Sequence, residues 1–234
     1  MTRGKPKIGI CAYCTEEKPL TKDHIPPRNL FPVSYRKNII SVPCCFDCHK
    51  PTSQDDEYFR SRLAIRNDTA THPAAQEVLP RIIRSFQKPQ KRGWTKKFFQ
   101  SIQEFEAVTP AGIYLGKGAT YDVDLTRLNR VAARVIKGLF YHHKHFALPK
   151  TYTVSAFSES SLTGPPDKVK LWLEMFASLA SEPSIEIGKG IFAYWFRFFS
   201  VDDISSAWLL LFYNKAFFIG SIISKKELEK RRKV

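Results

Sequence analysis

The sequence predicts an α+β protein in which a small, metal-stapled N-terminal module precedes a larger α+β domain with an antiparallel sheet. Three observations favour this class. All five cysteines stand at or before Cys48 in a chain of 234 residues. The segment that holds them is too poor in apolar residues for an independent core, so bound metal has to supply the missing stability. Beyond about Gln100, helical and strand-like patterns rich in aromatic residues follow one another.

The overall composition favours a globular protein with a polyanionic partner. Apolar residues make up 43% of the chain, and 37 Lys and Arg against 22 Asp and Glu give a net charge of +15. Such an excess of positive charge indicates a polyanionic partner such as nucleic acid. In the alternative, the charge only aids solubility. No apolar stretch near Met1 resembles a signal peptide, so we expect a reducing, cytoplasmic setting in which paired cysteines bind metal.

We expect four segments along the chain. Residues 8–66 form the metal-stapled module, 67–99 a helical and basic linker, 100–224 an α+β domain of unknown role, and 225–234 a basic tail. The linker is strongly basic, and we interpret it as a helix end followed by a solvated stretch. In the alternative it follows a phosphate backbone with Trp94 stacked on a base.

Two predicted helices carry charges of opposite sign. One helix begins near Ser53, and acidic residues fill its first turn: Asp55, Asp56 and Glu57. They suit the positive end of the helix dipole better than a second metal site. The other helix follows Asp124, with apolar positions at spacings of three and four. Its opposite face is interpreted as solvated rather than as a binding surface, and it carries Arg127, Arg130, Arg134 and Lys137.

The C-terminal half predicts an antiparallel sheet with helices packed on one side. Strands are expected over 152–157 and 191–199, with a helix over 167–180 between them. The apolar stretch 207–223 is interpreted as a buried β-hairpin that turns at Asn214 and Lys215. A membrane span would have to bury that lysine, so we expect no membrane association.

Two Cys-x-x-Cys turns, here called knuckles, are the strongest signal in the sequence. Cys11 and Cys14 form the first knuckle, and Cys45 and Cys48 form the second. A two-residue gap lets a tight turn aim two thiolates at one ion, and tetrahedral zinc takes four such ligands. We therefore predict structural Zn²⁺ at these four residues. Cys44 is interpreted as a small buried hydrophobe, with ligand swapping as the minority case.

Asp23 and His24 stand between the knuckles, just before Pro26 and Pro27. Neighbouring residues on a regular strand point to opposite faces. Because proline cannot continue a strand, a break at this point would let both side chains serve one site.

The order CAYC, KDHIPP, NIISVPCC, CFDCHK resembles the HNH endonucleases, whose ββα-metal core is often braced by zinc on two knuckles. The specific match covers about residues 8–66, and the remainder is a weaker likeness to longer bacterial and phage proteins of this group. The resemblance implies a zinc-braced, treble-clef-like ββα-metal module. It also implies a bacterial or phage-infected cell as the setting.

Carried over by position, the resemblance makes His24 the general base and Asp23 a ligand of a catalytic divalent cation, Mg²⁺ or Mn²⁺. His49 falls where the family has its final Asn or His, another ligand. Asn38 matches the middle Asn, which steadies the loop of the base, although counting back from the knuckle leads nearer to Ile40. Such residue types suit phosphodiester hydrolysis, because a histidine accepts a proton near neutral pH and a hard cation neutralises developing charge.

The leading hypothesis is therefore a metal-dependent HNH-type endonuclease acting on DNA. Basic residues around the loop could hold the phosphate backbone without reading bases: Lys22, Arg28, Arg36, Lys37 and Lys50. The alternatives are a non-catalytic zinc module that binds nucleic acid and a protein-interaction adaptor. The oligomeric state is open, and a dimer would cut both strands more easily. Three histidines fit no common metal-ligand spacing: His142, His143 and His145. We interpret them as residues whose charge interacts favourably with the C-terminal end of a helix.

Overall fold

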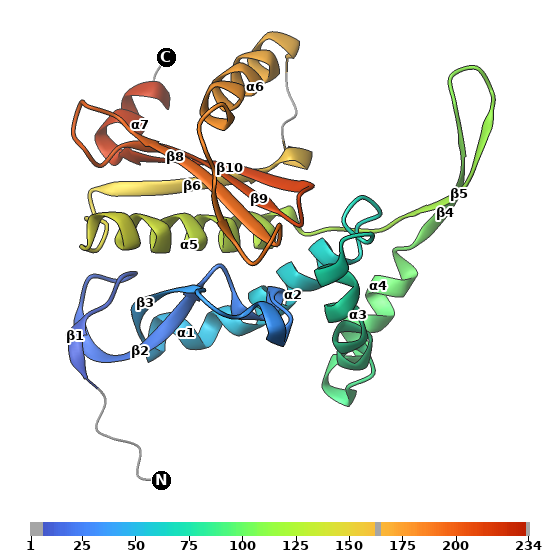
Figure 1. Ribbon diagram of the computed structural model, residues 1–234, viewed down its shortest axis with the longest axis horizontal. Helices are drawn as coiled ribbons and strands as arrows, with labels where there is room; N and C mark the ends of the chain where they lie inside the picture. The colour runs from blue at the N-terminus through green and yellow to red at the C-terminus, as the bar shows by residue number, and fades with distance from the viewer. Residues whose placement is uncertain (1–6, 162–164, 233–234) are drawn as a thin grey trace. The chain divides into compact units, whose positions relative to one another are not determined.

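The computed structural model describes residues 7–161 and 165–232 and contains helices together with three antiparallel sheets (Figure 1). The strand orders are β1-β2-β3, β6-β10-β9-β8-β7 and β4-β5. This arrangement confirms the mixture of helices and antiparallel strands that the sequence predicts.

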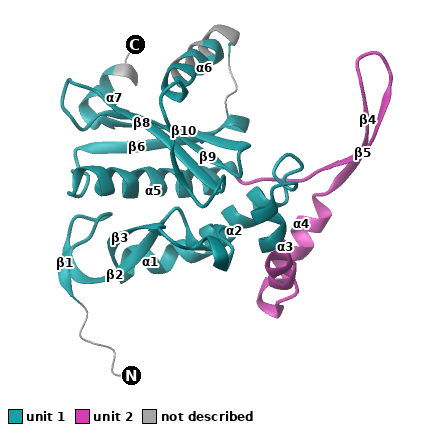
Figure 2. Ribbon diagram, in the orientation of Figure 1, with its two compact units in different colours: residues 1–78, 125–234 teal, residues 79–124 magenta. Residues whose placement is uncertain are grey.

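The chain forms two compact units whose boundaries differ from the expected segments (Figure 2). Residues 1–78 and 125–234 belong to the first unit, and residues 79–124 form the second. The cysteine-rich module therefore shares a unit with the C-terminal sheet, instead of standing apart from it. Residues 79–99 of the predicted linker and residues 100–124 of the predicted second domain make up the other unit, whereas residues 67–78 belong to the first.

The cysteine-rich module is a three-stranded sheet followed by helices. Its central strand β2 (Glu17–Ile25) pairs with β1 (Ile8–Ile10) and with β3 (Ile40–Cys45). β2 stays regular up to its last residue, so the proline pair ends the strand only after the Asp-His pair. The strand break that we expected at Asp23 and His24 is therefore absent from this described segment.

Helices follow β3 directly. α1 (Phe46–His49) carries the end of the second knuckle, and α2 (Ser53–Ala64) begins at the predicted Ser53. Short 3-10 helices occupy Arg28–Leu30 (η1), Val33–Tyr35 (η2), Lys50–Thr52 (η3), Pro89–Lys91 (η4) and Glu159–Ser161 (η5).

The C-terminal part is a five-stranded sheet with helices on both faces. Its strands are β6 (Tyr152–Ser158), β7 (Ile185–Ile187), β8 (Phe192–Phe198), β9 (Ser206–Phe212) and β10 (Ala216–Ser224). α6 (Pro166–Ala180) packs Phe176 and Leu179 against Leu209 and Ile219 on one face.

α5 (Leu125–Lys144) covers the opposite face (Figure 1). On that face the side chain of Ile136 lies directly over Gly220. Gly220 and Ile219 are neighbours on β10, so their outward directions are opposite. Our expectation of helices on one side only was therefore wrong. The sheet needs two covers because both of its faces are apolar, as the alternately directed and buried Trp208 and Leu209 show.

The apolar stretch near the C-terminus is the predicted β-hairpin. β9 and β10 pair antiparallel, with Phe212 opposite Ala216. The turn contains Asn214 and Lys215, as predicted, and it also includes Tyr213; Tyr213 and Asn214 take positive φ angles. No helix within residues 7–161 and 165–232 combines the length and apolar character needed to cross a membrane. α7 (Lys225–Arg232) forms most of the predicted basic tail, and residues 233–234 lie outside the described part.

The second unit contains a helical part and a β-ribbon. α3 (Pro73–Phe86) leads into it, α4 (Arg92–Gln100) follows, and β4 (Gln103–Val108) pairs with β5 (Tyr114–Thr120). α3 is the helix end that we expected in this basic stretch, and α4 lies where we expected a solvated linker. Trp94 packs 5.1 Å from Phe86 and 5.9 Å from Phe98 between ring centroids, so apolar contact orders this stretch.

Candidate metal centre and its polar neighbours

The four knuckle cysteines gather into one cluster. Their sulfur atoms all lie within 4.8 Å of one another, and the Sγ atoms of Cys14 and Cys45 are 3.8 Å apart. Four sulfurs bound at about 2.3 Å to one tetrahedral zinc stand about 3.8 Å from each other. The donor set and spacing therefore fit a structural metal such as zinc, as predicted.

Backbone N–H groups support this cluster. Tyr13 and Cys45 each donate a backbone N–H to the Sγ atom of Cys11 at 3.4 Å. Burial raises the pKa of Cys11, but hydrogen bonds from the Cys14, Cys45 and Tyr13 backbone outweigh it and lower the pKa to about 7. Such donors favour the thiolate form that binds metal.

Cys44 stays outside the cluster, as expected. Its side chain is fully buried, and its thiol donates to the carbonyl oxygen of Cys45 at 3.3 Å. Burial and the nearby Asp23 carboxylate raise its pKa far above the ordinary value. A buried neutral thiol of this kind acts as a small hydrophobe.

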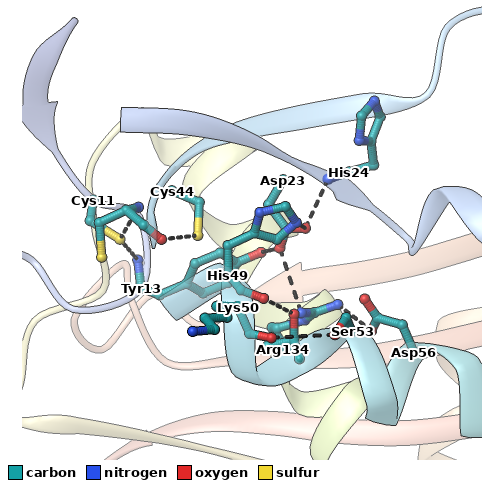
Figure 3. A network of polar contacts seen from close by, with 12 residues as sticks. Cys11, Tyr13, Asp23, His24, Cys44, His49, Lys50, Ser53, Asp56 and Arg134 are labelled. Atoms are coloured by element: carbon teal, nitrogen blue, oxygen red, sulfur yellow. Dashed lines mark hydrogen bonds and ion pairs between the residues drawn. The ribbon is translucent and has the colours of Figure 1, made fainter. Parts of the chain in front are cut away.

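Asp23 is the most buried carboxylate of the candidate site, with 4% of its surface exposed. Its Oδ2 accepts a hydrogen bond from the Tyr13 hydroxyl at 2.7 Å, and its Oδ1 accepts the backbone N–H of His24 at 3.1 Å (Figure 3). Burial and the Asp23 carboxylate raise the pKa of Tyr13 well above its ordinary value. Tyr13 therefore stays a neutral donor and holds the carboxylate in one orientation.

His49 reaches Asp23 from the adjoining helix α1. Its Nε2 lies 3.9 Å from the Oδ1 of Asp23. Two atoms that each bind one ion at about 2.1 Å stand at most about 4.2 Å apart. The structure therefore brings together the two residues predicted to hold a catalytic cation. No group of three or more metal-ligating side chains forms around them in residues 7–161 and 165–232, so other ligands would be water or substrate.

His24 leaves β2 on the side opposite to Asp23. Its imidazole projects away from the carboxylate in Figure 3, as expected for neighbours on a regular strand. Burial lowers its pKa, and the positive charges of Arg28, His49 and Lys22 lower it further, against the raising effect of Asp23. His24 therefore favours the neutral form that a general base requires. His49 acts on the pKa of His24 through charge, although the His24 side chain points to the opposite face of β2 from Asp23.

Asn38 lies in the loop before β3 and is exposed. It takes a positive φ of 66°, a conformation that Asn tolerates better than most residues. This backbone role explains an Asn here without any contact to His24. Ile40, the position nearer to the family spacing, is the first residue of β3 and pairs with Ile25.

The basic residues predicted to hold phosphate differ in their surroundings. Arg36 donates its Nε–H to the carbonyl oxygen of Phe31 at 3.1 Å, and Lys50 lies 5.5 Å from the ring centroid of Phe46. Lys22, Arg28 and Lys37 are exposed. Lys22 and His24 have the same parity on β2, so both lie on the face opposite to Asp23.

An ion-pair network that the sequence reasoning missed joins α5 to the module. Arg134 pairs with Asp56 on α2 and places its Nη1 3.9 Å from Asp23. Arg127 and Arg130 both pair with Asp55, at 2.7 and 2.8 Å. The basic face of α5 therefore pairs with the acidic first turn of α2. The sequence patterns indicated a solvated face for the first and a partner of the helix dipole for the second. Their opposite charges were the available signal.

Lys137 adds a second link from α5. Its ammonium donates to the carbonyl oxygen of Tyr13 at 2.6 Å, inside the first knuckle. Burial lowers the pKa of Lys137, against the raising effect of the thiols of Cys48, Cys11 and Cys14. A zinc tetrathiolate carries net negative charge, and a nearby ammonium offsets it.

The histidines near the end of α5 form no metal site. His143 lies 3.0 Å from the Tyr194 hydroxyl through its Nε2, and its ring is 4.1 Å from that of Phe196 between centroids. It is therefore a histidine packed among aromatic rings. Its ligating atoms belong to no metal-like group among the described residues.

Comparison of the chain with protein-family models, with curated proteins and with solved structures gives no match.

Proposed function

We propose that the protein is a metal-dependent endonuclease that hydrolyses phosphodiester bonds in DNA, built on a zinc-braced ββα-metal module of the HNH type. The observation that carries the proposal is the 3.9 Å approach of Asp23 Oδ1 and His49 Nε2. It occurs at the edge of the four-cysteine cluster, in a chain with a net charge of +15.

Each residue of the site has a chemical task in this proposal. Asp23 and His49 would hold a divalent cation, which supplies charge stabilisation at the scissile phosphate. In this proposal His24 accepts the proton of the attacking water at its imidazole, and its lowered pKa keeps it unprotonated near neutral pH. Because His24 and Asp23 leave opposite faces of β2, the scissile phosphate would have to lie across the edge of β2 that β1 leaves unpaired beyond Pro19. Lys22 and Arg28, both exposed near His24, bind flanking phosphates through charge.

The four cysteines have a separate task. Zinc at Cys11, Cys14, Cys45 and Cys48 fixes the two knuckles, and His49 directly follows the second of them. The position of His49 relative to β2 therefore depends on a metal that takes no part in the reaction. A structural site with four protein ligands is closed and leaves no place for substrate.

A non-catalytic module that binds nucleic acid is the second candidate, and one observation favours it. Asp23 already accepts a hydrogen bond from Tyr13 and lies near the guanidinium of Arg134. A carboxylate so well satisfied can be purely structural. In that case the basic surface binds DNA and no cleavage follows.

Plasmid cleavage tests the proposal. Purified full-length protein with Mg²⁺ or Mn²⁺ should nick or linearise supercoiled plasmid. His24→Ala should lower the rate by about 100-fold or more, as removal of a general base does. Its zinc content should not change. His142→Ala, which replaces an exposed histidine far along the chain on α5, is the matched control and should cleave like the wild type.

Equal cleavage by His24→Ala and the wild type would contradict the assigned role of His24. Salt-sensitive retardation of DNA without cleavage under either cation would favour the non-catalytic module. If the protein neither cleaves nor retards DNA, the protein-interaction adaptor is the remaining hypothesis.

A further inference from the structure

We infer that Arg134 sets the affinity of the candidate site for its divalent cation, so that the C-terminal part of the chain controls a site that lies in the N-terminal module. This inference rests on the proposed function, because it concerns the same cation. It assigns to Arg134 a positioning and charge-setting role, and no contact with substrate is required.

The two oxygens of Asp23 face different partners. Oδ1 faces His49, at 3.9 Å from its Nε2, whereas Oδ2 accepts the Tyr13 hydroxyl and lies 3.9 Å from Nη1 of Arg134. A cation shared with His49 would bind Oδ1, and Arg134 would stay on the other oxygen. The guanidinium therefore acts on the cation through one carboxylate, without occupying its place.

Arg134 is incompletely satisfied in this position. Its side chain is 11% exposed, and Nη2 pairs with Asp56. Within the described part of the chain, its Nε and Nη1 atoms are buried and make no hydrogen bond. Burial lowers the pKa of Arg134, but Asp56 and Asp23 outweigh it and raise the pKa, so the guanidinium stays charged.

The local charges leave room for added positive charge. Asp23 and Asp56 bring two carboxylates, and Arg134 brings one compensating charge. Burial raises the pKa of Asp56, and Arg134 opposes that rise. A divalent cation at Asp23 would relieve the unbalanced carboxylate, yet it would be repelled by Arg134 across that same group.

Two opposite effects on cation binding have to be weighed. Loss of an orienting partner of a ligand typically weakens metal binding about 10- to 100-fold. Asp23 keeps Tyr13 as an orienting donor, however, so little of that loss applies here. Removal of a buried positive charge one carboxylate away relieves strong repulsion even at an effective dielectric constant of about 20. Repulsion should therefore dominate.

Mn²⁺ binding to the zinc-loaded, full-length chain tests the inference by electron paramagnetic resonance. Asp23→Asn first identifies the site, since it should abolish the tightest Mn²⁺ binding. Arg134→Gln should tighten that binding by about tenfold or more. Asp56→Asn should weaken it about tenfold, because it removes a negative charge and frees the guanidinium to approach Asp23.

Arg130→Gln is the matched control. Arg130 also lies on α5 and also pairs with an acidic residue of α2, but its side chain is 64% exposed. Removing so exposed a charge should change Mn²⁺ affinity by less than about threefold. Opposite shifts in the Arg134 and Asp56 variants are not expected from general destabilisation. If Arg134→Gln fails to fold, Arg134→Met, which keeps an apolar side chain but removes the charge, takes its place and should also tighten binding.

The outcomes separate this inference from the proposed function. Unchanged Mn²⁺ affinity in both variants, with cleavage intact, would overturn the inference and leave the endonuclease. Weaker binding in Arg134→Gln would also overturn it, and would show that Arg134 chiefly orients Asp23. Absence of any Mn²⁺ binding that depends on Asp23, together with no cleavage, would overturn the proposed function itself.

Discussion

Tyr13 connects the two chemical parts of the module at the level of single residues. It stands between Cys11 and Cys14 of the first knuckle, donates its backbone N–H to Cys11, and donates its hydroxyl to Asp23. The knuckle thus fixes the backbone from which the phenol reaches the carboxylate. Loss of zinc should therefore disorder Asp23 even though Asp23 binds no zinc.

His143 shows how one buried histidine links stability to pH. Burial, together with the charges of His142 and His145, lowers the pKa of His143 to about 4. The unfolded chain, with a pKa of about 6.5, binds the proton in the range where the native state does not. The stabilising contribution is therefore complete above about pH 6.5 and is lost as pH falls toward 4.

Urea unfolding at pH 7.0 and 5.5, with excess zinc, measures this contribution. The wild type should lose roughly 0.5–1 kcal/mol more than His143→Phe between the two values, after allowance for partial solvent screening. Phenylalanine keeps the stacking with Phe196 but cannot be protonated. Equal pH dependence in both proteins would show that His143 is not the titrating group.

α5 is the element on which the first unit depends. One part of it faces the sheet through Ile136, and another faces the module through Arg134, Lys137 and Gly138. A Cβ at Gly138 would lie 2.5 Å from Ile25 Cδ1 and 3.2 Å from the Tyr13 hydroxyl. Glycine is needed there for close approach, although it weakens an isolated helix.

Gly138→Val should therefore destabilise the protein by about 1–3 kcal/mol through overpacking, despite removing a helix glycine. Ile25→Ala alone should cost about 2–5 kcal/mol, because it deletes a fully buried side chain. In the double variant the valine occupies the freed space. The double variant should therefore lose less stability than the sum of the losses in the two single variants. Urea unfolding of the four proteins gives the coupling energy, and strict additivity would refute the predicted clash.

At the scale of the whole molecule, local patterns predicted local structure well. The spacing of the cysteines predicted their cluster, and the apolar stretch predicted the β9–β10 hairpin. The helix expected near Ser53 is α2, although its N-cap is Thr52. Each of these signals is contained in a few neighbouring residues. The contact of Asp23 with His49 followed from a resemblance, and the structure does bring the pair together.

Long-range pairing could not be read in the same way. Arg134 and Asp56 carry opposite charges, but nothing local distinguishes a solvated basic face from one that meets an acidic helix. The direction of His24 depended on whether β2 stayed regular before its prolines, which its pairing with Ser41 decides. The unit boundaries depended on α5 packing against two distant segments at once.

Shared packing on α5 leads to a prediction about zinc removal. Structural zinc sites in small domains contribute about 10–16 kcal/mol of apparent binding free energy, so Cys14→Ser should unfold the module. Because Lys137 and Gly138 pack against Tyr13, α5 should loosen with it. Amide hydrogen exchange should then accelerate in residues 206–224 of the sheet as well as in residues 7–66.

Cys44→Ser is the matched control, because Cys44 is fully buried but lies outside the metal cluster. It should retain zinc, measured by elemental analysis, and leave exchange in residues 206–224 close to that of the wild type. Faster exchange confined to residues 7–66 in Cys14→Ser would mean that the module unfolds alone. The first unit would then consist of two independent parts, and Arg134 could not transmit the state of the sheet to Asp23.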